Sequence, residues 1–305
     1  MLRYIAVRLL YAAAVIAGVS VLVFFLVRLG GDPTALFLPP ETSPEEIARF
    51  RRQFGFDRPL PVQYLEFVGR ALQGDFGQSM RYQQPAMQLV LERLPATLQL
   101  AGAALLLSCV LGIPLGILAA VRRNSAFDRG GMVISLMGQS LPTFWLGLML
   151  VLVFSEKLHW LPASGRGSWA HLVLPAVALA GYSTAIITRL LRSSMLEVLQ
   201  ADYIRTARGK GLAESAVILR HALRNAAVPT LTVIALQVGA LLGGAVITEE
   251  VFAYPGMGRL AIQAIATRDF AIVQAFVLFM ALVIVAINLT VDMAYVLIDP
   301  RLKKK

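Results

Sequence analysis

The chain has 305 residues, of which 57% are apolar or aromatic and only 15% are charged, and its mean hydropathy is +0.70. Soluble chains carry about 25% charged residues, so this composition excludes a soluble globular protein, and the single cysteine, Cys109, excludes a disulfide-stapled scaffold. The class that remains is an integral membrane protein with several spans. The net charge of +10 indicates either nucleic-acid binding or loop charges that orient the protein in a bilayer.

Six stretches of the chain lack Asp, Glu, Lys and Arg and approach or exceed the roughly 20 residues that a helix needs to cross the hydrocarbon core. In chain order they are residues 9–27, 96–121, 130–155, 172–188, 225–248 and 270–291. The fourth is short, but its apolar face continues through Leu190 and Leu191. The side chains of Arg189 and Arg192 can extend to the membrane interface, so this stretch is still expected to be a span. The first is longer than the apolar core of a cleavable signal peptide. We therefore expect an all-α integral membrane protein with six transmembrane helices.

The polar segment between the first two spans is expected to form a small cap, residues 30–94. A Ser-Pro-Glu-Glu sequence at residues 43–46 provides an N-cap candidate, a proline at the first helical position and acids in the first turn. It predicts a short amphipathic helix, and two more helices are expected over residues 62–72 and 85–94. Too few apolar residues are present for an independent core.

The charges predict the orientation of the chain. Six spans place both termini on one side, which carries 16 Lys and Arg against five Asp and Glu, a net charge of +11. The other side carries 12 of each sign, and Asp292 lies within a span. An excess of Lys and Arg marks the cytoplasmic side, so both termini are predicted to be cytoplasmic. Topology therefore explains the basic charge, and we expect no nucleic-acid partner.

A long connection between the fourth and fifth spans, residues 192–224, is called the basic loop below. Asp202 can cap a short helix there, with Tyr203, Ile204 and Ala207 on one face. Gly209 and Gly211 are expected to end this helix, and residues 213–223 can form another. The alternative is a solvated basic linker that serves topology alone. Because apolar residues recur at helical spacing, a docked helix that binds another protein is favoured.

Several sequence strings resemble one protein family. In the basic loop they are Ala201-Asp202-Tyr203-Ile204-Arg205-Thr206-Ala207-Arg208-Gly209-Lys210-Gly211-Leu212 and Arg220-His221-Ala222-Leu223-Arg224-Asn225. Elsewhere they are Gly31-Asp32-Pro33, Gly74-Asp75-Phe76-Gly77-Gln78-Ser79, Pro142-Thr143-Phe144-Trp145-Leu146-Gly147, Leu161-Pro162, His171-Leu172-Val173-Leu174-Pro175, Glu249-Glu250-Val251-Phe252-Ala253-Tyr254-Pro255-Gly256-Met257-Gly258-Arg259-Leu260 and Asp299-Pro300-Arg301. Together, in this order, they resemble permease subunits of bacterial ABC importers of the dipeptide, oligopeptide, nickel and glutathione group.

The resemblance implies a type I ABC importer permease fold. It implies an extra N-terminal span in residues 1–29, a five-helix core in residues 95–298 and a basic tail in residues 299–305. It also implies that the basic loop contains a coupling helix that docks on an ATP-hydrolysing subunit. The residues carried over to that contact are Asp202, Tyr203, Ile204, Thr206, Ala207, Arg208 and Gly211. The Glu-Ala-Ala positions of the general permease signature are held here by Arg205, Thr206 and Ala207.

The resemblance further implies a complex in the bacterial inner membrane. Its other members would be a second homologous permease, two ATP-binding subunits that bind ATP and Mg, and an extracytoplasmic solute-binding protein. The chain itself would need no cofactor. Candidates for contact with the binding protein are Asp75, Glu250, Tyr254 and Arg259.

Polar residues within the spans are candidates for lining the substrate path, and they also serve as ordinary helix contacts. These candidates are Gln139, Ser140, Gln237, Asn288 and Asp292. Asn288 and Asp292 are one helical turn apart, and a structural pairing of Asp292 is favoured over a substrate contact.

The sequence lacks the residue patterns of an enzyme. Its three histidines have no metal-ligand spacing, and no Gly-x-x-x-x-Gly-Lys-Ser/Thr loop is present to bind ATP. We therefore expect a non-enzymatic permease, without a metal, that moves dipeptides or oligopeptides by alternating access. A nickel or glutathione permease of the same group is one alternative. A stand-alone secondary transporter or channel and a membrane enzyme are alternatives from other classes.

Overall fold

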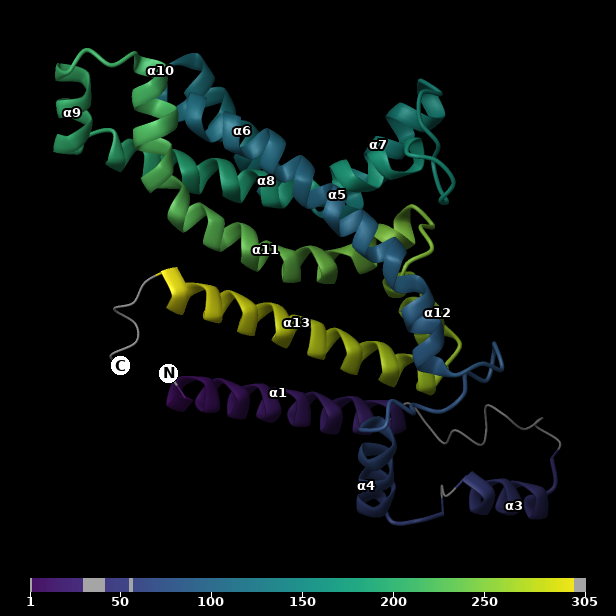
Figure 1. Ribbon diagram of the computed structural model, residues 1–305. Coiled ribbons are helices and arrows are strands. Elements are labelled where there is room, and N and C mark those ends of the chain that lie inside the picture. The colour runs from purple at the N-terminus through teal and green to yellow at the C-terminus, as the bar shows by residue number, and fades with distance from the viewer. Residues whose placement is uncertain (1, 30–41, 55–56, 299–305) are drawn as a thin grey trace. The chain divides into compact units, whose positions relative to one another are not determined.

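The structure, a computed structural model, describes residues 2–29, 42–54 and 57–298 (Figure 1). Within these ranges the regular secondary structure is helical, apart from one isolated bridge between Gln78 and Pro85. The described residues include five helices that are long and apolar enough to span a membrane, or six when one bent pair is counted as a span. This confirms the predicted all-α membrane fold. The strings at residues 31–33 and 299–301 and the basic tail lie outside the described residues.

The chain divides into two compact units. The first comprises Met1–Leu94, Leu260–Leu289 and Val296–Lys305, and the second comprises Pro95–Arg259 and Thr290–Tyr295. Three helices, α5 (Ala86–Val121), α12 (Met257–Ala266) and α13 (Phe270–Ile298), have residues in both units.

The first unit contains α1 (Leu2–Leu29), α3 (Pro44–Phe54), α4 (Leu60–Ala71) and most of α13 (Phe270–Ile298). Both predicted cap helices before residue 73 are confirmed as α3 and α4. The start of α3 is capped reciprocally, because the Ser43 hydroxyl accepts from the Glu46 N–H and donates to the Glu46 carboxylate. The core of this unit contains Phe24, Phe67 and Leu278.

A separate helix over residues 85–94 is a wrong prediction, because these residues begin the 36-residue helix α5. Pro95 lies inside α5 and does not end it. A proline removes one backbone hydrogen bond, and a helix can continue through it when packing holds both sides. Buried residues flank the proline here, Val90 before it and Ala96 after it.

In the second unit, α8 (Ala170–Val198) packs against α6 (Ala126–Ser140), α7 (Thr143–Leu150) and α11 (Leu223–Val251). It also approaches α5 closely. A Cβ atom on Gly116 of α5 would lie 2.9 Å from the carbonyl oxygen of Thr188 on α8, so only glycine permits this spacing.

The third predicted span, residues 130–155, is not one straight helix. It consists of α6 and α7, followed by the π-helix η1 (Val151–Lys157), and the pair bends by 105° at Leu141 and Pro142. The proline explains the break, because a residue before proline avoids the helical region, and Leu141 has an extended ψ of 127°. Among the described residues, the six predicted spans are therefore found as five unbroken helices and this bent pair.

The fifth membrane helix begins earlier than predicted. α10 (Glu214–Ala216) and the π-helix η2 (Val217–Ala222) run directly into α11, so residues 213–223 do not form an independent helix. No glycine or proline interrupts residues 214–228, which explains why the helix continues.

Candidate functional site

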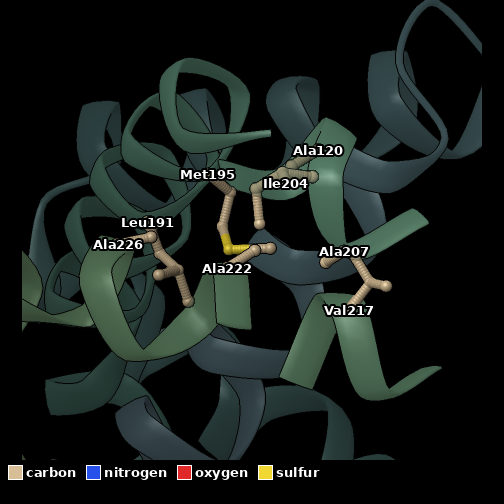
Figure 2. Packing of buried hydrophobic residues seen from close by; sticks show 8 residues of the cluster. All are labelled: Ala120, Leu191, Met195, Ile204, Ala207, Val217, Ala222 and Ala226. Carbon is tan, nitrogen blue, oxygen red and sulfur yellow. The ribbon is translucent and has the colours of Figure 1, made fainter. Parts of the chain in front are cut away.

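A short helix, α9 (Asp202–Gly209), forms the centre of the basic loop. Its side chains Ile204 and Ala207 are buried, with 0% and 7% exposure. They belong to a core cluster contributed by α5, α8, η2 and α11, shown in Figure 2. The other members of the cluster are Ala120, Leu191, Met195, Val217, Ala222 and Ala226. An eight-residue helix is too short to be stable alone, so this packing holds α9 in place.

The first turn of α9 differs from the predicted one. Ala201 occupies the N-cap position, and Asp202 is the first helical residue. Asp202 forms an ion pair with Arg205 at 2.9 Å, and the Asp202 side chain is 92% exposed. An acid in the first turn still stabilises the helix through the macrodipole, although it caps no backbone N–H here.

Gly211 ends the turn after α9, as predicted. Its φ of +74° lies in the left-handed region that glycine adopts without strain. The N–H of Gly211 donates to the Arg208 carbonyl at 2.9 Å. The Arg208 guanidinium also donates to both carboxylate oxygens of Glu214, at 3.1 and 2.6 Å, and this connects α9 to α10.

The surface of α9 that faces away from the core is polar. Of the seven residues expected to contact an ATPase, Asp202, Tyr203, Thr206, Arg208 and Gly211 are exposed. Ile204 and Ala207 point into the chain's own core instead, which leaves them no free surface for a partner. The Tyr203 hydroxyl accepts a 2.7 Å hydrogen bond from Asn225 on α11.

A salt bridge that the sequence analysis missed joins α6 to α8. The guanidinium of Arg192 donates to both carboxylate oxygens of Asp128, at 2.6 and 2.8 Å. The Asp128 side chain is only 5% exposed. Ser125 is the N-cap of α6, and its hydroxyl accepts a hydrogen bond from the Asp128 N–H. In the sequence, a serine followed three residues later by an acid was the signal for this helix start and for the position of Asp128.

A second missed feature is the buried carboxylate of Glu249 near the end of α11. It accepts from the Thr97 hydroxyl at 2.5 Å and from the N–H groups of Gly258 and Arg259 at 2.7 and 3.1 Å. The Thr97 oxygen accepts in turn from the Met257 N–H at 2.9 Å. This carboxylate therefore fixes the turn between α11 and α12. An acid at the end of an apolar stretch, followed by two closely spaced glycines, was the signal in the sequence.

The four candidates for contact with a binding protein differ in accessibility. Glu250 is exposed and lies 3.8 Å from the guanidinium of Arg259, which also donates to the Ala253 carbonyl at 2.7 Å. Asp75 is exposed and accepts from the Gly77 N–H within its own turn. Tyr254 is only 1% exposed, so it presents no free surface in this chain.

The Tyr254 hydroxyl donates to Gln99 at 3.1 Å. Burial raises the pKa of Tyr254 above its ordinary value. The side chain therefore remains a neutral hydrogen-bond donor at physiological pH, in a structural contact.

The candidate path residues do not form one cluster among the described contacts. Gln139 accepts from Arg189 at 2.9 Å, and the buried Gln237 donates to Ser183 on α8 at 2.9 Å. Ser140 and Asn288 are exposed, and Asp292 is half-buried. Among the described residues, no group of three His, Cys, Asp or Glu side chains could hold a metal ion.

Comparison with known families accounts for nearly the whole chain. Residues 112–304 match the family described as binding-protein-dependent transport system inner membrane component, and residues 1–101 match its N-terminal family. The chain belongs to this permease family. It is therefore a non-catalytic, multi-pass subunit of an ABC transporter in the bacterial inner membrane, and it needs no cofactor of its own.

Similar proteins agree with this assignment. The chain is 42% identical to the glutathione transport system permease protein GsiC of Escherichia coli (strain K12), over 100% of both chains. It is equally similar to GsiC of Salmonella typhi, again over 100% of both chains. A solved structure of the MetNI methionine ABC transporter in an inward-facing conformation matches with a TM-score of 0.56 at 19% identity. That match covers 68% of this chain and 95% of the other, and it shows that the fold is shared.

Proposed function

We propose that this permease subunit forms part of the pore of an ATP-driven importer for glutathione or peptides of similar size. The 42% identity to GsiC over the whole chain carries this proposal. The sequence analysis expected dipeptides or oligopeptides, with glutathione and nickel complexes as alternatives. The named relatives favour the glutathione alternative.

The proposed complex contains a second, similar permease, two ATP-binding subunits and an extracytoplasmic solute-binding protein. In this proposal, α9 docks on an ATP-binding subunit on the cytoplasmic side through its exposed residues Tyr203, Thr206 and Arg208. Family membership and the polar outer surface of α9 support this assignment.

The packing of α9 suggests how the force of ATP binding reaches the membrane. Ile204 and Ala207 belong to one buried cluster with residues at the end of α8 and the start of α11. Since such a cluster is close-packed, a displacement of α9 moves both helices together. The bidentate pair of Arg192 and Asp128 extends the connection from α8 to α6. Alternating access would then follow from the joint movement of these helices.

The docking role is tested with Thr206→Trp. Thr206 is exposed and bonds only to the carbonyl of Asp202 within its own helix, so the change blocks a docking surface without disturbing the core. We expect loss of co-purifying ATP-binding subunits and loss of transport, with unchanged yield of the folded chain. Thr267→Trp is the matched control. Thr267 is also exposed, directly follows α12 and bonds to the Gln263 carbonyl of that helix, and the proposed orientation places it on the opposite side. Normal transport by Thr206→Trp would overturn the docking assignment.

The substrate is tested with the complete complex in proteoliposomes. We expect ATP-dependent uptake of radiolabelled glutathione, with weaker uptake of a dipeptide and none of a nickel complex. Nickel uptake without glutathione uptake would contradict the proposed substrate. Uptake by the lone chain without ATP-binding subunits would favour a secondary transporter or channel.

A further inference from the structure

The helix α4 carries three different faces. Its inner face packs on α1, because Phe67 lies 5.6 Å from Phe24 between ring centroids, and the Tyr64 hydroxyl lies 2.8 Å from the Ser20 hydroxyl. A polar face carries Glu66, which pairs with Arg58, and Arg70.

The third face of α4 is apolar and exposed. Val62, Leu65 and Leu72, which is the C-cap residue of α4, are 41%, 68% and 84% exposed. At 3.6 residues per turn they fall within about 80° of the helix circumference, between the inner face and the polar face. We call these three residues the α4 apolar stripe. Apolar side chains that the chain itself leaves uncovered and that are grouped in this way mark an interaction surface.

The contacts of α4 with α1 place this stripe relative to the membrane. The apolar span of α1 is Ala6–Leu26. Ser20 precedes the end of that span by six residues, which at 1.5 Å per residue puts it about 9 Å inside the apolar segment. Because Tyr64 bonds to Ser20, α4 lies beside the last turns of α1 within this segment, and Figure 1 shows α4 at the C-terminal end of α1.

The same end of α1 is also exposed and apolar. Leu22 and Leu26 are each 57% exposed, and Phe25 is 41% exposed. The α4 apolar stripe therefore lies at the same depth as an apolar helix surface that has to face lipid or another membrane helix. A helix with one apolar and one charged face lies in the membrane interface with the apolar face buried about 5 to 10 Å. Tyrosine is enriched at that boundary, which suits Tyr64.

We propose that α4 is an interfacial helix whose apolar stripe is immersed in lipid, at the bilayer surface where α1 ends. The polar face, with Arg70 and the pair of Arg58 and Glu66, then faces the phospholipid headgroups and water. The cap of this permease is in that case partly a membrane-bound element. The proposal depends on α1 being a span, and it does not depend on the transported substrate.

The test uses single nitroxide labels on Leu65→Cys and Leu72→Cys in a Cys109→Ala background. The full transporter is held in phosphatidylcholine and phosphatidylglycerol nanodiscs. Collision rates are measured with oxygen, which partitions into lipid, and with a water-soluble nickel chelate. Arg70→Cys, on the polar face of the same helix, is the matched control. All three positions are exposed, so the labels leave the core intact.

We expect a ratio of oxygen to nickel collisions that is several-fold higher at Leu65 and Leu72 than at Arg70. Equal ratios at all three positions would place the stripe in water and overturn the proposal. Low collision rates with both reagents at Leu65 would show that a neighbouring protein covers the stripe, and this would also overturn it.

Discussion

The hydroxyl of Thr97 donates a 2.5 Å hydrogen bond to the carboxylate of Glu249, although 152 residues separate them in the sequence. Both side chains are buried, with 2% and 0% exposure. Through the backbone N–H groups of Gly258 and Arg259, the same carboxylate holds the start of α12 against the end of α11. One acidic side chain thus connects three parts of the second unit.

Replacing Glu249 with alanine is expected to destabilise the folded chain. The change leaves buried N–H groups without an acceptor, and the loss is about 3 kcal/mol. Thermal unfolding of the purified chain measures it. Glu250→Ala is the control, because Glu250 is the neighbouring acid and is exposed. If the two variants unfold at the same temperature, the role assigned to Glu249 is wrong.

Gly258→Ala is expected to lower the yield of folded protein sharply. A Cβ atom at this position would overlap the backbone of Val246, which cannot move aside as a flexible side chain could. Gly239→Ala in α11 is the control, because outside the adjacent helix backbone no described atom lies within 4 Å of its Cβ position. Fluorescence size-exclusion profiles of the two variants compare the yields. A monodisperse Gly258→Ala peak of full height would count against the described packing.

The pair of Asp128 and Arg192 is expected to contribute strongly to stability. Removing one partner of a largely buried, bidentate pair costs about 3 kcal/mol or more. A double-mutant cycle with Asp128→Ala and Arg192→Ala measures the coupling energy. The same cycle on the exposed pair of Asp202 and Arg205 is the reference, and it is expected to give no more than about 0.5 kcal/mol. Equal coupling energies in the two cycles would refute the distinction between them.

The predicted orientation is tested with cysteines at Gln78 and Lys210, two exposed positions, in a Cys109→Ala background. A membrane-impermeant maleimide added outside spheroplasts is expected to label Gln78→Cys and to leave Lys210→Cys unlabelled. Detergent should make both reactive. Labelling of Lys210→Cys alone before detergent would reverse the topology.

Hydrophobic periodicity and length predicted the membrane class and most helices, because a bilayer demands long apolar segments. Local signals also placed α3, through Ser43 and Glu46, and the turn after α9, through Gly211. They failed at two prolines in opposite ways. Pro95 lies within a continuous helix, whereas Pro142 starts a new one after a sharp bend. The packing around each proline decides whether the helix continues or breaks. A single sequence does not show that packing.

The polar contacts were the hardest part to predict. Asp128 is one of the five acids counted on the cytoplasmic side, and Arg192 was expected to extend to the membrane interface, yet the two side chains bond to each other. Ile204 and Ala207 were expected to contact a partner, and in this chain they are buried in a cluster with residues of α8 and α11. A helical pattern identifies which residues share a face, but it does not say whether the chain itself or another protein covers that face.

The packing of α9 also constrains the order in which this part of the chain folds. Val217, Ala222 and Ala226 complete the cluster around Ile204, and they are synthesised after α9. Until that part of the chain has left the ribosome, the eight residues of α9 lack the contacts that keep them helical. A nascent chain that stops before residue 217 therefore lacks a formed α9, and under the proposed docking role an ATP-binding subunit would bind only after the fifth membrane helix has begun to insert.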